Sequence, residues 1–270
     1  MVINPNRVIG YRLESVGATD VGRKRQLNED VFLTDETLGL YLVADGMGGH
    51  AAGEVASRLA ADEIFRALGG QTGGVEETWP DHWDTERSAT ANLLVDAILS
   101  GHDRVTNAVN RDANLKGMGT TVVVAVHPPA SRHLVVCHVG DSRAYRWRRN
   151  ELEILTEDHS WVHEQVAAGF LSEEAARTHP LKNVVTQALG GSAEPKVDIL
   201  ETEMRHGDIY LLCSDGLNSM LTDTEIALIL ARAGSLHDCA AQLIDAANER
   251  GGNDNVTVVL LRASQMTHSS

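Results

Sequence analysis

Gly39-Leu-Tyr-Leu-Val-Ala-Asp45-Gly46 is an apolar run typical of a buried strand, and it stops abruptly at an aspartate beside a glycine. The same arrangement returns in His133-Leu-Val-Val-Cys-His-Val-Gly140-Asp141 and in Asp208-Ile-Tyr-Leu-Leu-Cys-Ser-Asp215-Gly216. A buried strand holds a carboxylate rigidly at its end. Several such ends that converge would form a cluster of like charges that only a cation can stabilise. These junctions therefore predict a core of buried strands built around metal ions.

Two further acidic residues share this setting at a strand boundary. Hard divalent cations such as Mg²⁺ or Mn²⁺ take oxygen ligands, keep several waters and need only a few carboxylates each. At any single position, aspartate before glycine can equally be ordinary turn chemistry. Three such junctions in one chain favour the metal interpretation. The candidate ligands, enough for two or three ions, are Asp30, Asp45, Asp141, Asp215 and Asp254.

Composition limits the other possibilities. A chain of 270 residues with 43% hydrophobic residues can bury a full core as one large domain or two small ones. The formal charge of −15 argues against nucleic-acid binding, which rests on clustered Lys and Arg. The three cysteines show no paired spacing, which suits a reducing compartment. No signal peptide and no apolar run of about 18 residues is evident, so we expect a soluble cytoplasmic protein with no membrane partner.

Hydrophobic periodicity predicts strands grouped with strands and helices grouped with helices, without βαβ alternation. This grouping indicates an α+β layered fold with antiparallel sheets. We expect the segment 69–87 to be a loop and the segment 158–189 to be mixed and weakly helical. Helices are expected over 54–68, 91–113, 222–233 and 236–250. Strands are expected over 12–19, 31–34, 38–44, 120–127, 133–139, 142–147, 151–155, 208–214 and 255–261.

Seven separated motifs lie along the chain. They are Thr19-Asp-Val-Gly-Arg-Lys-Arg25-Gln-Leu-Asn28-Glu29-Asp30, Asp45-Gly-Met-Gly-Gly-His50, Gly119-Thr-Thr121, Val139-Gly-Asp-Ser-Arg-Ala-Tyr145, Thr156-Glu-Asp-His159, Ser214-Asp-Gly-Leu217 and Asp254-Asn-Val-Thr-Val258. Together they resemble the motifs of the metal-dependent, type 2C (PPM) serine/threonine protein phosphatases, in the same order and over about residues 17–261, and their form is similar to the bacterial branch.

The resemblance implies a four-layer α-β-β-α sandwich, in which two antiparallel sheets pack together and helices cover both outer faces. It also implies a single phosphatase catalytic domain over residues 1–270, with a variable flap at about 158–189 beside the active site. The grouping of strands and helices agrees with this architecture.

The resemblance further implies a core site for two Mn²⁺ or Mg²⁺ ions. In it Asp45 bridges both ions, the Gly46 carbonyl binds one of them, and Asp215 and Asp254 complete the set. A third, weaker ion would use Asp141 together with Asp215. The remaining implied roles are water binding or orientation by Glu29 and Asp30, and phosphate binding by Arg25.

The implied reaction is hydrolysis of phosphoserine or phosphothreonine. A water that bridges two cations loses a proton near neutral pH and displaces the Ser or Thr oxygen directly. The planar fork of Arg25 can hold two phosphate oxygens, although Arg25 could also be a surface residue in a basic patch with Arg23 and Lys24. We expect phosphorylated proteins as substrates, a serine/threonine kinase as the opposing enzyme, and a monomer.

Two positions depart from the family pattern. Eukaryotic relatives carry His directly after the Asp-Gly pair, where this chain has Met47. His50 could supply the leaving-group proton instead or could only pack beside the site. Ser219 stands where some relatives have another metal-binding aspartate, so that corner is expected to bind its ion less tightly.

Three other interpretations compete. Cys137 and Arg143 have the spacing of thiol-dependent phosphatases, but Cys137 falls inside an apolar strand and Asp141 would repel phosphate. A pseudophosphatase is disfavoured because all the core carboxylates are present. A regulator that acts on one partner only is less plausible than a general partner of a kinase, because no sensor domain is visible in this chain.

His159 and His163 have the spacing of a helical metal pair without a nearby third ligand.

Overall fold

The apolar runs form strands of two antiparallel sheets in a computed structural model of the chain, which describes residues 10–48, 52–69, 83–129, 131–232 and 234–266. The first sheet has the order β1 (Tyr11–Asp20), β11 (Val256–Gln265), β10 (Ile209–Cys213), β7 (Arg143–Arg148) and β8 (Glu151–Ile154). The second has the order β2 (Asp30–Asp35), β3 (Leu40–Met47), β5 (Val122–Val126), β6 (His133–Val139) and β9 (Asp198–Glu203), and the short β4 (Gly119–Thr120) pairs with β3.

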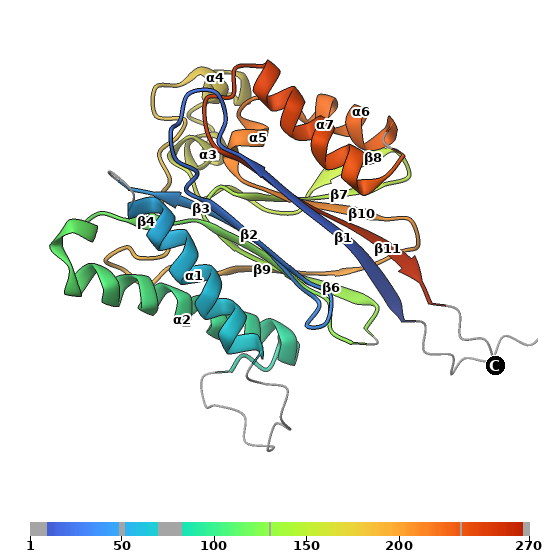
Figure 1. Cartoon of the computed structure of the whole chain (residues 1–270), viewed down its shortest axis with the longest axis horizontal. Coiled ribbons are helices and arrows are strands. Elements are labelled where there is room, and N and C mark those ends of the chain that lie inside the picture. The colour runs from blue at the N-terminus through green and yellow to red at the C-terminus, as the bar shows by residue number, and fades with distance from the viewer. Residues whose placement is uncertain (1–9, 49–51, 70–82, 130, 233, 267–270) are drawn as a thin grey trace, which may run out of the picture.

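Helices cover the outer face of each sheet, so the predicted four-layer sandwich is confirmed (Figure 1). The second sheet is covered by α1 (Ala52–Gly69) and α2 (Ala89–Arg111), and a short 3₁₀ helix follows at Ala113–Leu115. The first sheet is covered by α5 (Asp215–Asn218), α6 (Asp223–Arg232) and α7 (Leu236–Glu249). Among the described helices, none combines the length and the hydrophobicity that crossing a bilayer requires.

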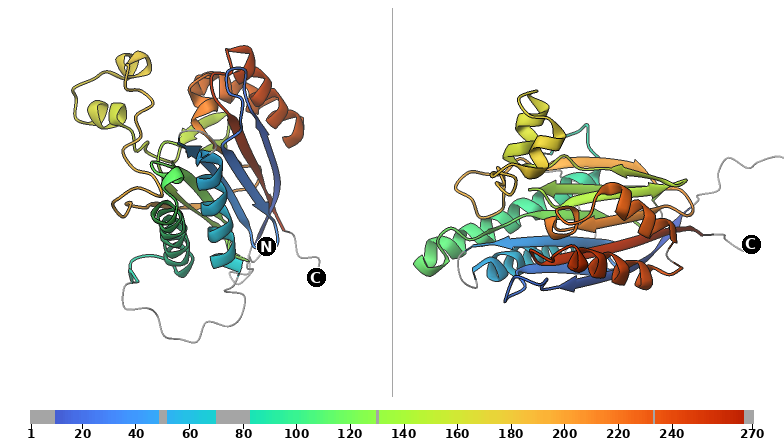
Figure 2. Two further views of the ribbon diagram at one scale, coloured as in Figure 1. Left: turned by 60° about the vertical axis from the view of Figure 1, so that its left-hand side comes forward. Right: turned by 90° about the horizontal axis from the view of Figure 1, so that it is seen from above.

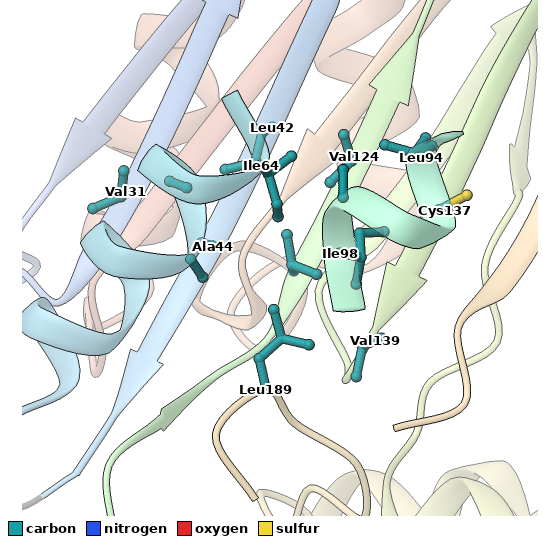
Figure 3. Packing of buried hydrophobic residues seen from close by; sticks show 14 of the residues in the cluster. Val31, Leu42, Ala44, Ile64, Leu94, Ile98, Val124, Cys137, Val139 and Leu189 are labelled. Atoms are coloured by element: carbon teal, nitrogen blue, oxygen red, sulfur yellow. The ribbon is translucent and has the colours of Figure 1, made fainter. Parts of the chain in front are cut away.

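The alternation of side chains along a strand explains why the runs that lead to Asp45, Asp141 and Asp215 are continuously apolar. Along β3, Leu40, Leu42 and Ala44 face the helices α1 and α2, as Figure 3 shows for the last two. The intervening Tyr41 and Val43 face the first sheet instead. Because both faces of the strand are buried, both sets of positions must be apolar. The strands β5, β6, β10 and β11 alternate in the same way between the inter-sheet layer and a helical layer.

The structure adds detail that periodicity did not predict. β9 was missed because it is an edge strand whose sequence, Asp198-Ile-Leu-Glu-Thr-Glu203, alternates weakly and carries three acidic residues. α2 begins two residues earlier than expected, since the Ser88 hydroxyl caps it by accepting from the Ala91 N–H. The expected loop 69–87 falls mostly outside the described residues.

The segment expected to form a flap contains two short helices, α3 (Trp161–Ala167) and α4 (Glu173–Thr178), which project beside the sandwich (Figure 2). Main-chain hydrogen bonds fasten both of its ends. The His159 N–H donates to the Gly140 carbonyl at 3.0 Å, and Leu189 and Thr120 exchange N–H···O bonds of 2.8 and 3.1 Å.

The antiparallel order brings the motif residues to one end of the sandwich. In antiparallel neighbours, the end of one strand lies beside the start of the next. Asp30 opens β2 and Asp45 lies near the end of β3, while Asp141 follows β6. In the first sheet, Asp215 follows β10 and Asp254 precedes β11. Distant parts of the sequence therefore meet at this end.

The core layer between α1, α2 and the second sheet should be sensitive to cavities. Leu42 is fully buried there, so Leu42→Ala should lower the free energy of unfolding by about 2–5 kcal/mol. Urea denaturation of the two proteins measures the difference. Leu228→Ala is the control, because Leu228 is 46% exposed on α6 and its loss should change stability by at most about 0.5 kcal/mol. Equal effects of the two substitutions would contradict the assigned layer.

Candidate metal centre

The Asp-Gly pairs at positions 45 and 215 are not turns. Asp45 lies inside β3, opposite Asp30 of β2, and Gly46 continues the strand. A Cβ on Gly46 would lie 2.2 Å from the carbonyl oxygen of Gly53. Gly216 sits in the first turn of α5, where a Cβ would come within 1.8 Å of the main chain of Asn255. Close approach of backbones requires these glycines, so the turn interpretation is wrong for both pairs.

Asp30 is held rigidly by two hydroxyl groups. Its Oδ2 accepts hydrogen bonds from Ser214 Oγ at 2.7 Å and from Thr257 Oγ1 at 2.6 Å. Its Oδ1 is buried and has no hydrogen-bond partner among the described residues. The sequence analysis missed the roles of Ser214 and Thr257, although Ser214 directly precedes Asp215 and Thr257 lies in the Asp254 motif. Their hydroxyls leave one oxygen of Asp30 free for a ligand.

Three more carboxylates complete the centre of the cluster. The carboxyl groups of Asp45 and Asp215 lie close enough to interact with each other. Asp215 Oδ1 is buried and also has no partner in the described part of the chain. Asp141 is 7% exposed and lies near enough to repel both Asp45 and Asp215.

Burial and mutual repulsion disfavour the charged forms of these groups. Desolvation, followed by repulsion from Asp30 and Asp215, raises the pKa of Asp45 well above its ordinary 3.8. The pKa values of Asp30, Asp215 and Asp141 rise to about 7, 6 and 8, in each case mainly by desolvation. Two orphaned oxygens within an all-oxygen donor set fit hard divalent cations, which would offset this repulsion.

Arg25, Glu29 and Asp254 lie at the rim of this cluster. Arg25 Nη2 donates to Asp254 Oδ2 at 2.7 Å, and the arginine side chain is 47% exposed. Glu29 Oε1 accepts from the Gly53 N–H at 3.1 Å, and burial raises the pKa of Glu29. The guanidinium therefore lies beside the carboxylates and open to solvent, where a phosphate could reach it.

Other predicted positions fall outside this arrangement. His50 lies outside the described residues. Met47 ends β3, and Ser219 is exposed at the end of α5.

The thiol-phosphatase interpretation has no structural basis. Cys137 is fully buried within β6, and burial raises the pKa of its thiol. Arg143 is engaged by Asp158 through two hydrogen bonds of 2.8 and 2.7 Å. A low-pKa thiolate beside a free arginine is therefore absent from this part of the described chain.

His159 gathers with His138 and Asp198 rather than with His163. One potential ligand atom from each of the three lies within 4.8 Å of the other two. The Gly140 N–H donates to His159 Nδ1 at 3.2 Å, so His159 Nε2 carries the proton and donates to Asp198 Oδ2 at 3.3 Å. Metal binding at Nε2 would displace that proton while Nδ1 remains an acceptor. The cluster is better described as a hydrogen-bonded anchor at the start of the flap.

Sequence comparison identifies relatives along almost the whole chain. A family model described as protein phosphatase 2C matches residues 20–260. The serine/threonine phosphatase stp of Listeria welshimeri is 39% identical over 259 residues, covering 92% of this chain and 95% of that protein. Protein phosphatase PhpP of Streptococcus pneumoniae is 34% identical over 254 residues, covering 92% and 96%.

Solved structures agree in fold. The Mycobacterium tuberculosis serine/threonine phosphatase PstP/Ppp superimposes with a TM-score of 0.79 at 34% identity, over 93% of this chain and 99% of that one. A structure of the PstP catalytic domain in complex with 2 manganese ions gives 0.79 at 33% identity, over 94% and 99%. The chain therefore belongs to the protein phosphatase 2C family, and it is a metal-dependent serine/threonine protein phosphatase.

Proposed function

We propose that the carboxylate cluster is a catalytic centre for two Mn²⁺ or Mg²⁺ ions. Asp45 would bridge them, the Gly46 carbonyl would bind one, and Asp215 and Asp254 would complete the set. Asp141 and Asp215 would hold a third, weaker ion. The observation that carries this proposal is a pair of buried oxygens, on Asp30 and Asp215, that have no hydrogen-bond partner among the described residues and lie amid mutually repelling carboxylates.

The protein residues around the ions have separate tasks. When bound, the ions lower the pKa of the attacking water and offset charge on the phosphoryl group. Asp30, fixed by its two hydroxyl partners, and Glu29 orient water at the centre. Arg25 exchanges its bond with Asp254 for two phosphate oxygens and stabilises the charge that spreads over them. Held in line by these groups, the phosphoester is hydrolysed directly, without a phosphoenzyme.

The proton for the leaving Ser or Thr oxygen needs a separate donor. Met47 cannot supply it because a thioether carries no proton. His50, three residues further on, is our candidate for this catalytic role.

The biological setting follows from the substrate class. The enzyme acts on phosphoproteins, and we propose that it opposes a serine/threonine kinase and its substrates in the cytoplasm. Residues 1–270 would act as one catalytic domain with its flap at about 158–189, as a monomer. Fold-level analogy supports these statements.

Metal dependence is the first test. The purified chain should release phosphate from a phosphothreonine peptide with added Mn²⁺, lose this activity in excess chelator, and keep it after thiol alkylation, because Cys137 is buried. Phosphate release is measured directly. Turnover that persists in chelator would contradict the metal centre, and loss on alkylation would revive the thiol mechanism.

Asp45→Asn should lower kcat by at least about a hundredfold, because the residue proposed to bridge the two ions is lost. It should also stabilise the metal-free protein. The raised carboxylate pKa values mean that, between about pH 4 and 8, the folded state binds more protons than the unfolded state, so the free energy of unfolding falls as pH rises. In chelator, the Tm gain of Asp45→Asn over the unsubstituted chain should therefore be larger at pH 8 than at pH 5.

The matched control for this substitution is Asp112→Asn, which changes an exposed aspartate after α2 and should alter neither kcat nor the pH dependence of Tm. Unchanged turnover of Asp45→Asn would remove the bridging role. A Tm that falls equally at both pH values would argue against like-charge repulsion at this position.

Arg25→Ala should chiefly raise KM for a phosphopeptide, by about tenfold or more, because a charge-assisted grip on phosphate is lost. Steady-state kinetics at saturating Mn²⁺ separate KM from kcat. Arg23→Ala in the same loop is the control and should leave KM within about twofold. A change in Mn²⁺ affinity alone would contradict phosphate binding by Arg25.

A further inference from the structure

The loop 20–29 carries Arg25 and Glu29 to the rim of the metal centre. Within the described part of the chain, the ion-pair partners of Arg25 are Asp254 at 2.7 Å and Glu29 at 3.9 Å. The arginine side chain is 47% exposed. A substrate phosphate would draw the guanidinium away from Asp254. The backbone of the loop must then determine where Arg25 stands.

One buried side chain fastens this backbone on both sides of Arg25. Asn255 Nδ2 donates to the Val21 carbonyl at 3.0 Å and to the Leu27 carbonyl at 2.9 Å. Asn255 Oδ1 accepts from the Glu29 N–H at 2.8 Å. Both amide hydrogens are thus used, which only an asparagine-like group can do here. Asn255 is 4% exposed, so water cannot readily replace these bonds.

Other hydrogen bonds hold both ends of the loop, and at its second end the Glu29 carbonyl accepts from the Gly46 N–H at 3.2 Å and from Ser57 Oγ at 2.6 Å. The Arg23 N–H donates to the Gly252 carbonyl at 2.7 Å, and the Gly22 N–H donates to Asp20 Oδ1 at 2.8 Å. Asn28 Nδ2 reaches Thr19 Oγ1 at 2.8 Å from a partly exposed position. Asn255 is the one side chain among the described residues that joins positions 21, 27 and 29 at a single point.

We infer that Asn255 is a positioning residue for phosphate recognition: it holds the loop so that Arg25 meets the substrate phosphate beside the metal centre. The inference deepens the proposed function and rests on the phosphate-binding role proposed for Arg25. The loop would otherwise sample other conformations, and the arginine would contact phosphate only in some of them. Loss of the bonds made by Asn255 should therefore weaken phosphate binding.

A double-mutant cycle tests this inference with the full chain at saturating Mn²⁺. Asn255→Ala should raise KM for a phosphothreonine peptide by about tenfold, with a smaller change in kcat, and should weaken inhibition by inorganic phosphate to the same extent. In the Arg25→Ala background, the same substitution should change KM by less than about twofold, because the arginine it positions is already gone. Full additivity would overturn the inference and leave Asn255 a structural residue.

Asn92 offers a matched control. It is 6% exposed, its Nδ2 donates to the carbonyls of Asp84 and Ser88, and its Oδ1 accepts from the Asp84 N–H, but it lies near the start of α2. Asn92→Ala loses equivalent bonds and should leave KM unchanged. An equal rise in KM would show a general loss of stability and overturn the inference.

Asn255→Asp provides a second route if Asn255→Ala does not fold. It keeps the shape and the acceptor for the Glu29 N–H but loses both donors, so it should reproduce the rise in KM. A normal KM in Asn255→Asp would overturn this inference and leave the proposed role of Arg25 intact. Normal KM in Arg25→Ala would overturn the proposed role of Arg25 and, with it, this inference.

Discussion

Repulsion among buried and half-buried carboxylates is the constraint on which this structure depends. Asp30 and Asp45 face each other on adjacent strands, and Asp141, Asp215 and Asp254 approach from three further segments. Like charges opposite each other destabilise a sheet, and desolvation increases the cost. The surrounding layers must therefore supply enough packing to hold the groups together until cations bind. The three apolar layers of the sandwich, with β3 buried on both faces, meet that requirement.

Much of the fold could be predicted because hydrophobic periodicity within single segments indicates most of its strands and helices. The doubly buried runs of β3, β10 and β11 and the helical spacing of α1 and α7 are signals within a few residues of one another. β9 escaped because it lies at a sheet edge, where exposure permits Asp198, Glu201 and Glu203 and weakens the apolar pattern. Element ends differed by up to four residues, as at the end of β11, and caps such as Ser88 decide some of them rather than periodicity.

The candidate site was only partly readable from the sequence. Aspartates at the ends of apolar runs have a local signal, and the structure brings all of them together. The contacts that orient them join residues more than 180 positions apart, as in the bonds from Ser214 and Thr257 to Asp30. Such pairings depend on the register between the two sheets, which no single segment encodes. The neighbours of His159 illustrate the same limit: sequence spacing suggested His163, but strand topology brings His138 and Asp198 to it.

The contacts that attach the flap to the sandwich lie at its two ends, and most of its side chains lie between them. Its ends are fastened by main-chain bonds between His159 and Gly140 and between Leu189 and Thr120, and the His159 side chain adds bonds to Gly140 and Asp198. The side chains in between are mostly exposed on α4 and mostly half-buried on α3. Substitutions there can accumulate without disturbing the carboxylate cluster. The architecture is therefore modular: a change in this peripheral segment would alter the surface beside the carboxylate cluster and leave the cluster itself in place.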